Sequence, residues 1–177
     1  MALELEARLR QSIGELQARL RARLGGIRLV RAEGIHLTLR FLGPTSPAQA
    51  EALRPLLAAA AAACPAAEVQ VAGLGTFPER GSPRVLWLGL DAPPAILETQ
   101  RACERAARAA GFEPEERPFR AHLTLGRWRD RAPRPDLPPA DLGTARLESL
   151  ILFRSELLPD GAVYTPMAEF ALGAART

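Results

Sequence analysis

A four-residue phrase that occurs twice constrains the fold of this chain more than any other feature. H-L-T-L occupies residues 36–39 and again 122–125, and the two copies hold both histidines of the chain. Apolar and polar residues alternate in each copy, which is the period of a β-strand with one buried face. Each copy should therefore present one imidazole and one hydroxyl on one face and its leucines toward a core. The chain is expected to contain two equivalent strands, 122 − 36 = 86 residues apart.

The elements around the two phrases recur in a similar order, with a motif strand and a helix in each half. Apolar periodicity and Pro or Gly boundaries predict helices over 3–24, 46–65 and 95–110. Strands are expected over 27–30, 35–42, 68–74, 85–90, 119–127, 147–153 and 163–172, with a turn over 158–161. This pattern predicts an α+β fold, a single domain over 1–177 with two pseudo-symmetric lobes. Their antiparallel sheets should face a central groove lined by the phrases from opposite sides, with helices on the outer faces.

Charge and composition narrow the class of protein only slightly. All 23 cationic residues are arginine, and the formal net charge is +3. Guanidinium groups hold phosphate well, but the abundance of Ala, Pro and Gly also indicates a coding bias, so arginine content alone identifies no ligand. No apolar run approaches the ~20 residues that span a bilayer, and the chain opens on acidic residues. A cytoplasmic protein without membrane contact is therefore expected.

Two imidazoles beside two hydroxyls favour chemistry on a phosphodiester. Near neutral pH, one imidazole can activate an attacking oxygen while the other protonates the leaving oxygen, so His36 and His122 are the expected catalytic pair. Thr38 and Thr124 would donate hydrogen bonds to the phosphate oxygens. A metal site would need a third ligand, which neither phrase supplies, so we expect no metal and no other cofactor.

Further substrate-binding residues follow from strand alternation. Arg40 and Arg120 should lie beside the histidines, whereas Arg127 should lie on the opposite face unless a bulge at Gly126 turns its side chain. Trp87 should face the groove, because its leucine neighbours take the core face.

The phrases resemble the paired signature motifs of the two-histidine phosphoesterase superfamily. H-L-T-L-R-F-L-G and P-F-R-A-H-L-T-L-G-R are most similar to motifs of the RNA 2′,3′-cyclic phosphodiesterases, historically called 2′-5′ RNA ligases. The similarity includes F-P-E-R-G-S-P-R-V-L-W-L-G-L and extends over about 25–172. It implies hydrolysis of a terminal RNA 2′,3′-cyclic phosphate to a 2′-phosphate without metal or nucleotide cofactor, together with reversible 2′-5′ RNA ligation.

The resemblance also implies roles for individual residues. His36 matches the acid that protonates the departing 3′-oxygen and His122 the base that activates water, while Thr38 and Thr124 match phosphate-contacting hydroxyls. Arg127 matches a basic residue that closes the second motif. The expected partners are RNA ends, single-stranded or tRNA-derived, with no obligate protein partner and a monomeric enzyme. A phosphodiesterase for a small nucleotide or a 2′-5′ oligonucleotide, and a non-catalytic RNA-binding module, remain alternatives.

The start of the chain departs from the pattern that the resemblance implies. Members of this family usually open with a short apolar strand before the first helix, whereas the periodicity here predicts a helix from Leu3 onward. The loss of that strand would leave one sheet edge unpaired.

Overall fold

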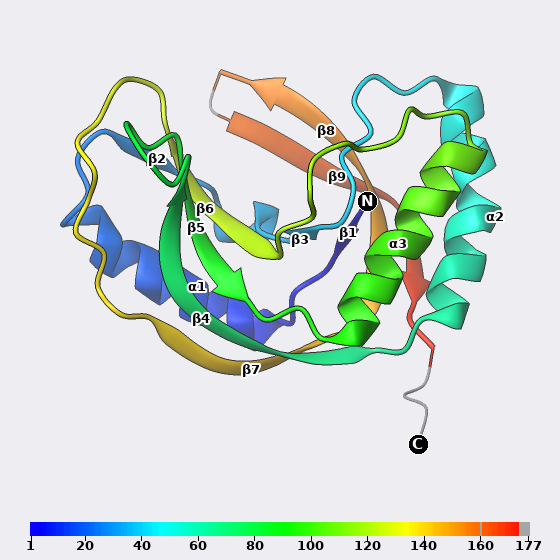
Figure 1. Cartoon of the computed structure of the whole chain (residues 1–177), viewed down its shortest axis with the longest axis horizontal. Coiled ribbons are helices and arrows are strands. Elements are labelled where there is room, and N and C mark those ends of the chain that lie inside the picture. Colours follow the sequence, from blue (N-terminus) through cyan, green and yellow to red (C-terminus); the bar gives the residue numbers. More distant parts are fainter. Residues whose placement is uncertain (160, 174–177) are drawn as a thin grey trace.

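The structure is a computed structural model, and it describes residues 1–159 and 161–173. In this part of the chain, three α-helices and nine strands form an α+β fold (Figure 1). The elements are β1 (Ala2–Leu3), α1 (Ala7–Arg21), β2 (Ile27–Leu29), a 3₁₀ turn (Ala32–Gly34), β3 (Leu37–Thr38), α2 (Pro47–Ala63), β4 (Ala67–Phe77), β5 (Val85–Leu90), α3 (Pro94–Ala109), β6 (His122–Trp128), β7 (Asp141–Leu147), β8 (Ser149–Leu158) and β9 (Gly161–Ala171).

The nine strands pair antiparallel in the order β7-β4-β5-β6-β3-β1-β8-β9, with β2 added beside β6. The β4–β5–β6 half and the β8–β9 hairpin lie on two sides of the short central strands β1 and β3 (Figure 1). The predicted α+β class and its two antiparallel halves are confirmed. The halves are continuous rather than separate sheets, because β3 pairs directly with β6.

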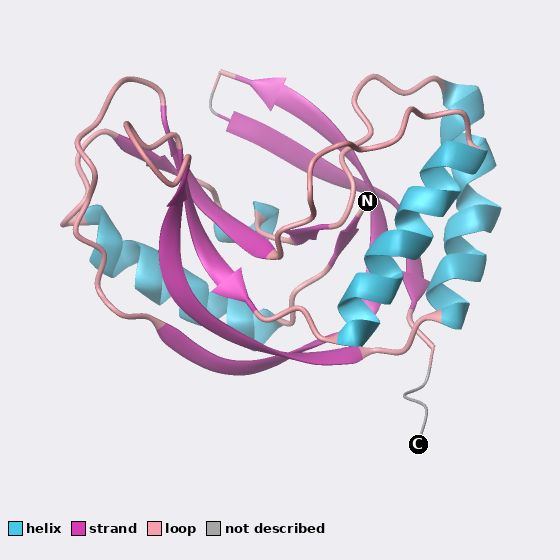
Figure 2. Ribbon diagram, in the orientation of Figure 1, coloured by secondary structure: helices cyan, strands magenta, loops and turns pink. Residues whose placement is uncertain are grey.

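Each half of the sheet carries its own helices (Figure 2). Helix α1 buries its apolar stripe, at Leu9, Ile13, Leu16 and Leu20, beside the β4–β7 half. Helices α2 and α3 pack against each other, and α2 contacts the β8–β9 hairpin. Helix α2 starts close to the predicted residue 46 with a capping box, in which the Ser46 hydroxyl oxygen and the Gln49 side chain accept from the first free N–H groups.

The first residues form a strand, so the prediction of a helix from Leu3 and an unpaired sheet edge is wrong. Ala2 pairs with Thr38 on one side and Ile151 on the other, which places β1 between β3 and β8. Leu3 is fully buried, and α1 begins only at Ala7. The apolar residues here fit both the strand period of two and the helical spacing of four, so periodicity could not separate the two elements.

Other strand predictions also differ from the structure. Strand β4 continues to Phe77 and β8 to Leu158, beyond the predicted ends at 74 and 153. Strand β7 covers Asp141–Leu147, where no element before residue 147 was predicted. Strand β3 has two residues instead of the predicted 35–42, because the N–H groups of Leu39 and Arg40 bond to the Met1 carbonyl. The turn predicted over 158–161 includes Asp160, which lies outside the described residues.

The leucines of both phrases lie in the core, as alternation predicts. Leu37, Leu123 and Leu125 have no exposed surface, and Leu39 is 4% exposed. The opposite face of β3 and β6 is thereby left to the polar residues of the phrases. No helix in the described part of the chain has the length and apolar character to cross a membrane.

Replacing Leu3 by Ala tests the place of β1. We expect the free energy of unfolding to fall by about 2–4 kcal/mol, because a fully buried leucine leaves a cavity between β3 and β8. Urea denaturation measures the change. Leu157→Ala is the control, since Leu157 is 87% exposed and its loss should change the free energy by less than about 0.5 kcal/mol. Equal stability of the two variants would contradict the central position of β1.

Candidate active site

One register contact brings the two phrases together. Leu37 of β3 faces Leu123 of β6 in the antiparallel ladder. Continuing this register by one residue sets His36 opposite Thr124 and Thr38 opposite His122. All four side chains share the face opposite the buried leucines, and diagonal neighbours of this kind are roughly 7–8 Å apart. Both imidazoles can therefore reach one group seated between them.

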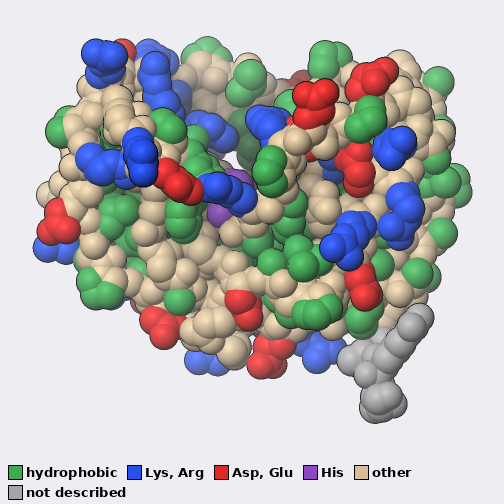
Figure 3. Space-filling view, in the orientation of Figure 1, with side chains coloured by type: hydrophobic (Ala, Val, Ile, Leu, Met, Phe, Trp, Pro, Cys, Tyr) green, Lys and Arg blue, Asp and Glu red, His purple; other side chains and the backbone are tan. Residues whose placement is uncertain are grey.

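The structure corrects the predicted placement of the phrases in the groove. They were expected to line it from opposite sides, but β3 and β6 are adjacent strands in the middle of the sheet. Figure 3 shows histidine at the base of a hollow in the surface, with arginine side chains and apolar groups around it. The four polar residues thus form the floor of the groove, and the walls come from other strands.

His36 is packed among aromatic rings of the β8–β9 hairpin. The Phe153 ring stacks at 5.1 Å between centroids, and the Tyr164 ring stands edge-on at 4.6 Å. Burial lowers the pKa of His36 to about 4, and the nearby positive N-terminus acts in the same direction. A hydrogen bond with the backbone of Gly34 raises the pKa but does not offset burial. His36 is therefore neutral at pH 7 in the free protein.

His122 is fixed by a backbone carbonyl. Its Nδ1 lies 2.7 Å from the carbonyl oxygen of Arg120, which can only accept, so Nδ1 carries the hydrogen and Nε2 keeps its lone pair. Burial lowers the pKa of His122, the bond to the Arg120 carbonyl raises it, and the charge of Arg127 lowers it. A neutral imidazole with a free Nε2 has the form required of a general base.

The two histidines have related surroundings in the two halves of the sheet. Phe77 of β4 stands edge-on to His122 at 5.2 Å between centroids, as Tyr164 of β9 does to His36, whereas the Phe153 ring stacks on His36. Each imidazole also bonds to the backbone two residues before it. Phe153 and Tyr164 were not predicted from the sequence, because no motif links them to His36 and only the β1–β8 pairing brings them near.

A bulge turns Arg127 toward His122, so strict alternation gave the wrong face. The register of β5 on β6 shifts between Leu86 and Trp87, which leaves Leu125 as an extra residue on β6. Beyond this point Arg127 shares the face of His122, and its charge acts on the pKa of that imidazole. The sequence predicts that a bulge at Gly126 would turn the Arg127 side chain to the face of the histidines, and the observed bulge lies directly before Gly126.

The other two predicted arginines have carboxylate partners. Arg40 is largely buried, with Nε 2.7 Å from Glu104 and Nη1 3.5 Å from Glu115, so it ties the end of the first phrase to α3 and the following loop. Arg120 is exposed and pairs with Glu79, while its guanidinium carbon lies 5.7 Å from the centre of the Phe77 ring. Of the three arginines, the structure therefore brings Arg127 into the neighbourhood of His122, leaves Arg120 beside Phe77, and holds Arg40 in an ion-pair network.

Trp87 lies on the predicted face, directly opposite Thr124 in the ladder. Its indole covers Gly75, where a Cβ atom would lie only 2.1 Å from a ring carbon. Phe77 packs on the same indole at 5.4 Å between centroids. The Trp87 Nε1 atom is buried without a hydrogen-bond partner in the described structure, so the indole forms part of the packed wall beside the four polar residues.

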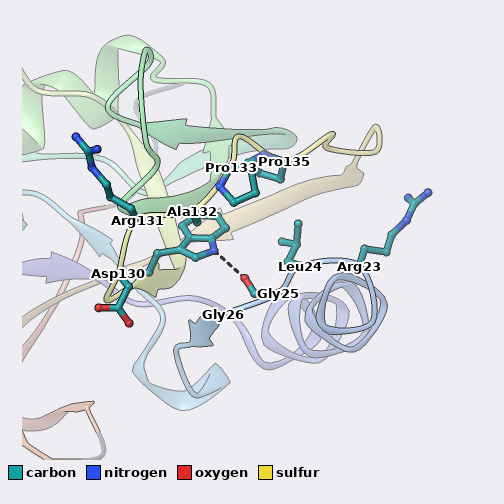
Figure 4. A pocket seen from close by; sticks show the side chains of 10 residues that line it. Arg23, Leu24, Gly25, Gly26, Asp130, Arg131, Ala132, Pro133 and Pro135 are labelled. Atoms are coloured by element: carbon teal, nitrogen blue, oxygen red, sulfur yellow. Dashed lines mark hydrogen bonds between the residues drawn. The ribbon is translucent and has the colours of Figure 1, made fainter.

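A separate pocket, with a volume of about 370 Å³, lies between the end of α1 and the loop after β6 (Figure 4). The indole of Trp128 closes it by donating a hydrogen bond to the carbonyl of Gly25, at 3.1 Å. Its lining contains no histidine and no hydroxyl side chain, so it lacks the groups that the predicted chemistry requires. Among the described residues, no three His, Cys, Asp or Glu side chains are grouped to hold a metal ion.

Comparison with known proteins gives a family. The sequence model of the LigT-like phosphoesterases matches residues 3–87 and then 88–164, so each match contains one H-L-T-L phrase. A protein of Methanothermobacter thermautotrophicus is 29% identical over 97% of this chain and 97% of its own. A protein of Thermus thermophilus is 32% identical over 97% of this chain and 88% of its own. Both carry the name RNA 2′,3′-cyclic phosphodiesterase.

Solved structures agree with the sequence comparison. A crystal structure of a Thermus thermophilus protein superimposes with a TM-score of 0.87 and 29% identity, over 99% of this chain and 97% of that one. E. coli LigT crystallised with 3′-AMP gives a TM-score of 0.82 and 27% identity, over 97% and 95% of the two chains.

The low pKa of His36 predicts a loss of stability in acid. Its folded-state pKa of about 4 lies below the ordinary 6.5, so the unfolded chain takes up the proton first as the pH falls. Between pH 7 and pH 4.5 this histidine should lower the free energy of unfolding by about 2–3 kcal/mol. Urea titrations at both pH values should show a smaller difference for His36→Gln. An unchanged difference would contradict the burial of a neutral imidazole.

Proposed function

Because the chain belongs to the LigT-like phosphoesterase family, we propose that it opens terminal 2′,3′-cyclic phosphates on RNA to 2′-phosphates. The relatives named RNA 2′,3′-cyclic phosphodiesterase support this activity. The observation that carries the proposal is the pairing of Leu37 with Leu123, which sets two imidazoles and two hydroxyls on one face of the sheet, opposite the core. That arrangement matches the two proton transfers and the charge stabilisation that the reaction needs.

In the proposed reaction, His122 acts as the base. Its Nε2 takes a proton from a water molecule, and the oxygen of this water attacks phosphorus. The bond from phosphorus to the 3′-oxygen then breaks, and His36 donates a proton to that oxygen, so the phosphate stays on the 2′-oxygen. Thr38, Thr124 and Arg127 stabilise the charge on the non-bridging oxygens. With an RNA 5′-hydroxyl in place of water, the same steps join two ends through a 2′-5′ linkage.

The acid role of His36 depends on the substrate. Burial holds the pKa of His36 near 4, so the free protein holds this imidazole in the neutral form. A phosphodiester anion between the two histidines favours the charged form and raises the pKa of the imidazole that donates to it. Binding of the cyclic phosphate would therefore supply the protonated acid, while the free Nε2 of His122 supports its role as base.

The distribution of charge favours RNA over a small nucleotide. The segments 78–84 and 127–134 carry six arginines and two acids, a net charge of +4, whereas the whole chain carries +3. Arg80, Arg129 and Arg131 are exposed there. Arg84 holds the two segments together by donating to the Arg129 carbonyl at 2.6 Å. We call these two segments, which follow β4 and the middle of β6, the arginine rim. Its positive charge suits an RNA strand with several phosphates better than a small ligand with one phosphate.

The proposal includes a monomer that acts in the cytoplasm. A single chain supplies His36, His122, Thr38 and Thr124, so catalysis needs no group from a second copy. Two free, buried cysteines, Cys64 and Cys103, suit a reducing compartment.

The central test is an assay on a short RNA that ends in a 2′,3′-cyclic phosphate, with a chelator present. The wild type should produce a 2′-phosphate, and His36→Ala and His122→Ala should each lower kcat by about 10²–10⁴-fold, because each removes one proton transfer. Thr38→Val and Thr124→Val should lower kcat by about 10²–10³-fold through the loss of one hydrogen-bond donor. The pH dependence should be bell-shaped, with one limb for each imidazole.

Each histidine variant is also tested for binding of the same RNA. Binding retained without turnover agrees with catalysis by the pair. Wild-type protein that binds the RNA but leaves it intact would support a non-catalytic RNA-binding module. Turnover of a 2′,3′-cyclic mononucleotide or a 2′-5′ oligonucleotide, with no turnover of the RNA, would support a small-nucleotide phosphodiesterase.

The arginine rim predicts a dependence on RNA length. In the double variant Arg129→Gln/Arg131→Gln, KM for a ten-nucleotide RNA should rise several-fold at low salt, and its salt slope should fall by roughly 0.7 for each lost phosphate contact. KM for a 2′,3′-cyclic mononucleotide should stay the same. The charge-matched control is Arg101→Gln/Arg105→Gln, which changes two exposed arginines of α3. Equal effects of the two double variants, or a raised KM for the mononucleotide, would contradict binding of the RNA strand along the arginine rim.

A further inference from the structure

Gln17 is a buried polar residue for which the proposed mechanism has no role. It lies on α1 and is 7% exposed, within the apolar stripe of that helix. Its Nε2 donates to the carbonyl of Val30, at 2.8 Å, and to the carbonyl of Leu125, at 3.0 Å. A helix side chain thus bonds to two extended segments, one at the end of β2 and one within β6.

The second of these carbonyls belongs to the bulge in β6. Leu125 has no partner in the ladder with β5, and its side chain is fully buried. A buried carbonyl needs a hydrogen-bond donor, and the Leu125 carbonyl has two: Gln17 and the N–H of Val30, at 2.9 Å. The next residue, Gly126, lets β2 approach closely, because a Cβ atom there would lie 2.9 Å from the Arg28 carbonyl.

The bulge decides where Arg127 points. In a regular strand Arg127 would share the core face with Leu125, whereas the extra residue moves it to the face of His122. We propose that Gln17 is a positioning residue, which holds the bulged carbonyl of Leu125 and thereby directs the Arg127 guanidinium toward the substrate phosphate. This inference rests on the phosphate-binding role of Arg127 in the proposed function.

A double-mutant cycle on kcat/KM tests the inference. Gln17→Met keeps the length of the side chain but removes both donors. Arg127→Ala and Gln17→Met should each lower kcat/KM for the cyclic-phosphate RNA by roughly tenfold or more, and the double variant should lose less than about twofold beyond Arg127→Ala. Gln17→Asn, which keeps the amide on a shorter side chain, provides a milder variant if Gln17→Met does not fold.

The pH profile provides a readout that a general loss of packing would not move. The charge of Arg127 lowers the pKa of His122, so displacing the guanidinium lets that pKa rise. The acidic limb of the kcat profile, which His122 sets once the bound phosphate has raised the pKa of His36, should therefore move to higher pH in the Gln17 variant and in Arg127→Ala alike. Gln11→Met is the matched control, because Gln11 lies exposed on the same helix and bonds only to Glu15 among the described contacts. It should leave the rate and the profile unchanged.

Three results would overturn the inference. If the losses of Gln17→Met and Arg127→Ala are additive, Gln17 acts independently of Arg127. If Gln17→Met melts at a lower temperature but keeps the kcat/KM of the wild type and the acidic limb of its kcat profile, its role is structural alone. If Arg127→Ala retains full activity, the phosphate-binding role of Arg127 in the proposed function fails together with the inference about Gln17. The first two results, in contrast, overturn only the inference about Gln17.

Discussion

The contact between Leu37 and Leu123 is the interaction on which the rest of the site depends. It joins the two halves of the sheet, and each leucine is fully buried. Because successive strand residues face opposite sides, a slip of one residue would send the leucines toward the groove and the polar residues toward the core. Burial of the two leucines therefore selects the register that sets His36 and His122 beside one exposed surface.

The same packing that orders the imidazoles also controls their protonation. Phe153 and Tyr164 surround His36, and Phe77 lies against His122, so the pKa of each histidine falls because water is excluded from the charged form. The neutral form suits His122 in its proposed role as base, because a neutral imidazole can accept a proton without any further change. An acid needs a charge that compensates for burial, and a bound phosphodiester carries one, so the proposed mechanism couples the protonation of His36 to substrate binding.

Several features of the site and fold could be predicted from the sequence because they follow from local periodicity. Alternation identified the face of the histidines and threonines and the core face of the leucines. The same rule failed for Arg127, where an extra residue interrupts the strand. For Arg40, the phrase gave no sign of the acidic partners on α3 and the loop after it. Periodicity also misassigned the first residues, because Leu3 and Leu5 have the strand spacing of two, whereas Leu5 and Leu9 have the helical spacing of four.

The sequence by itself determined which four polar residues form the site, that they share one face, and to which family the chain belongs. Each H-L-T-L phrase contains a histidine and a threonine two residues apart, so this information lies within a few neighbouring residues. The tertiary structure decided that the two phrases lie on adjacent strands at the base of the groove, which aromatic rings desolvate each imidazole, and where Arg127 points. These outcomes depend on partners far away in the chain, such as the bond from Gln17 to Leu125 across 108 residues. Strand pairing and helix docking set such contacts, and no local pattern encodes them.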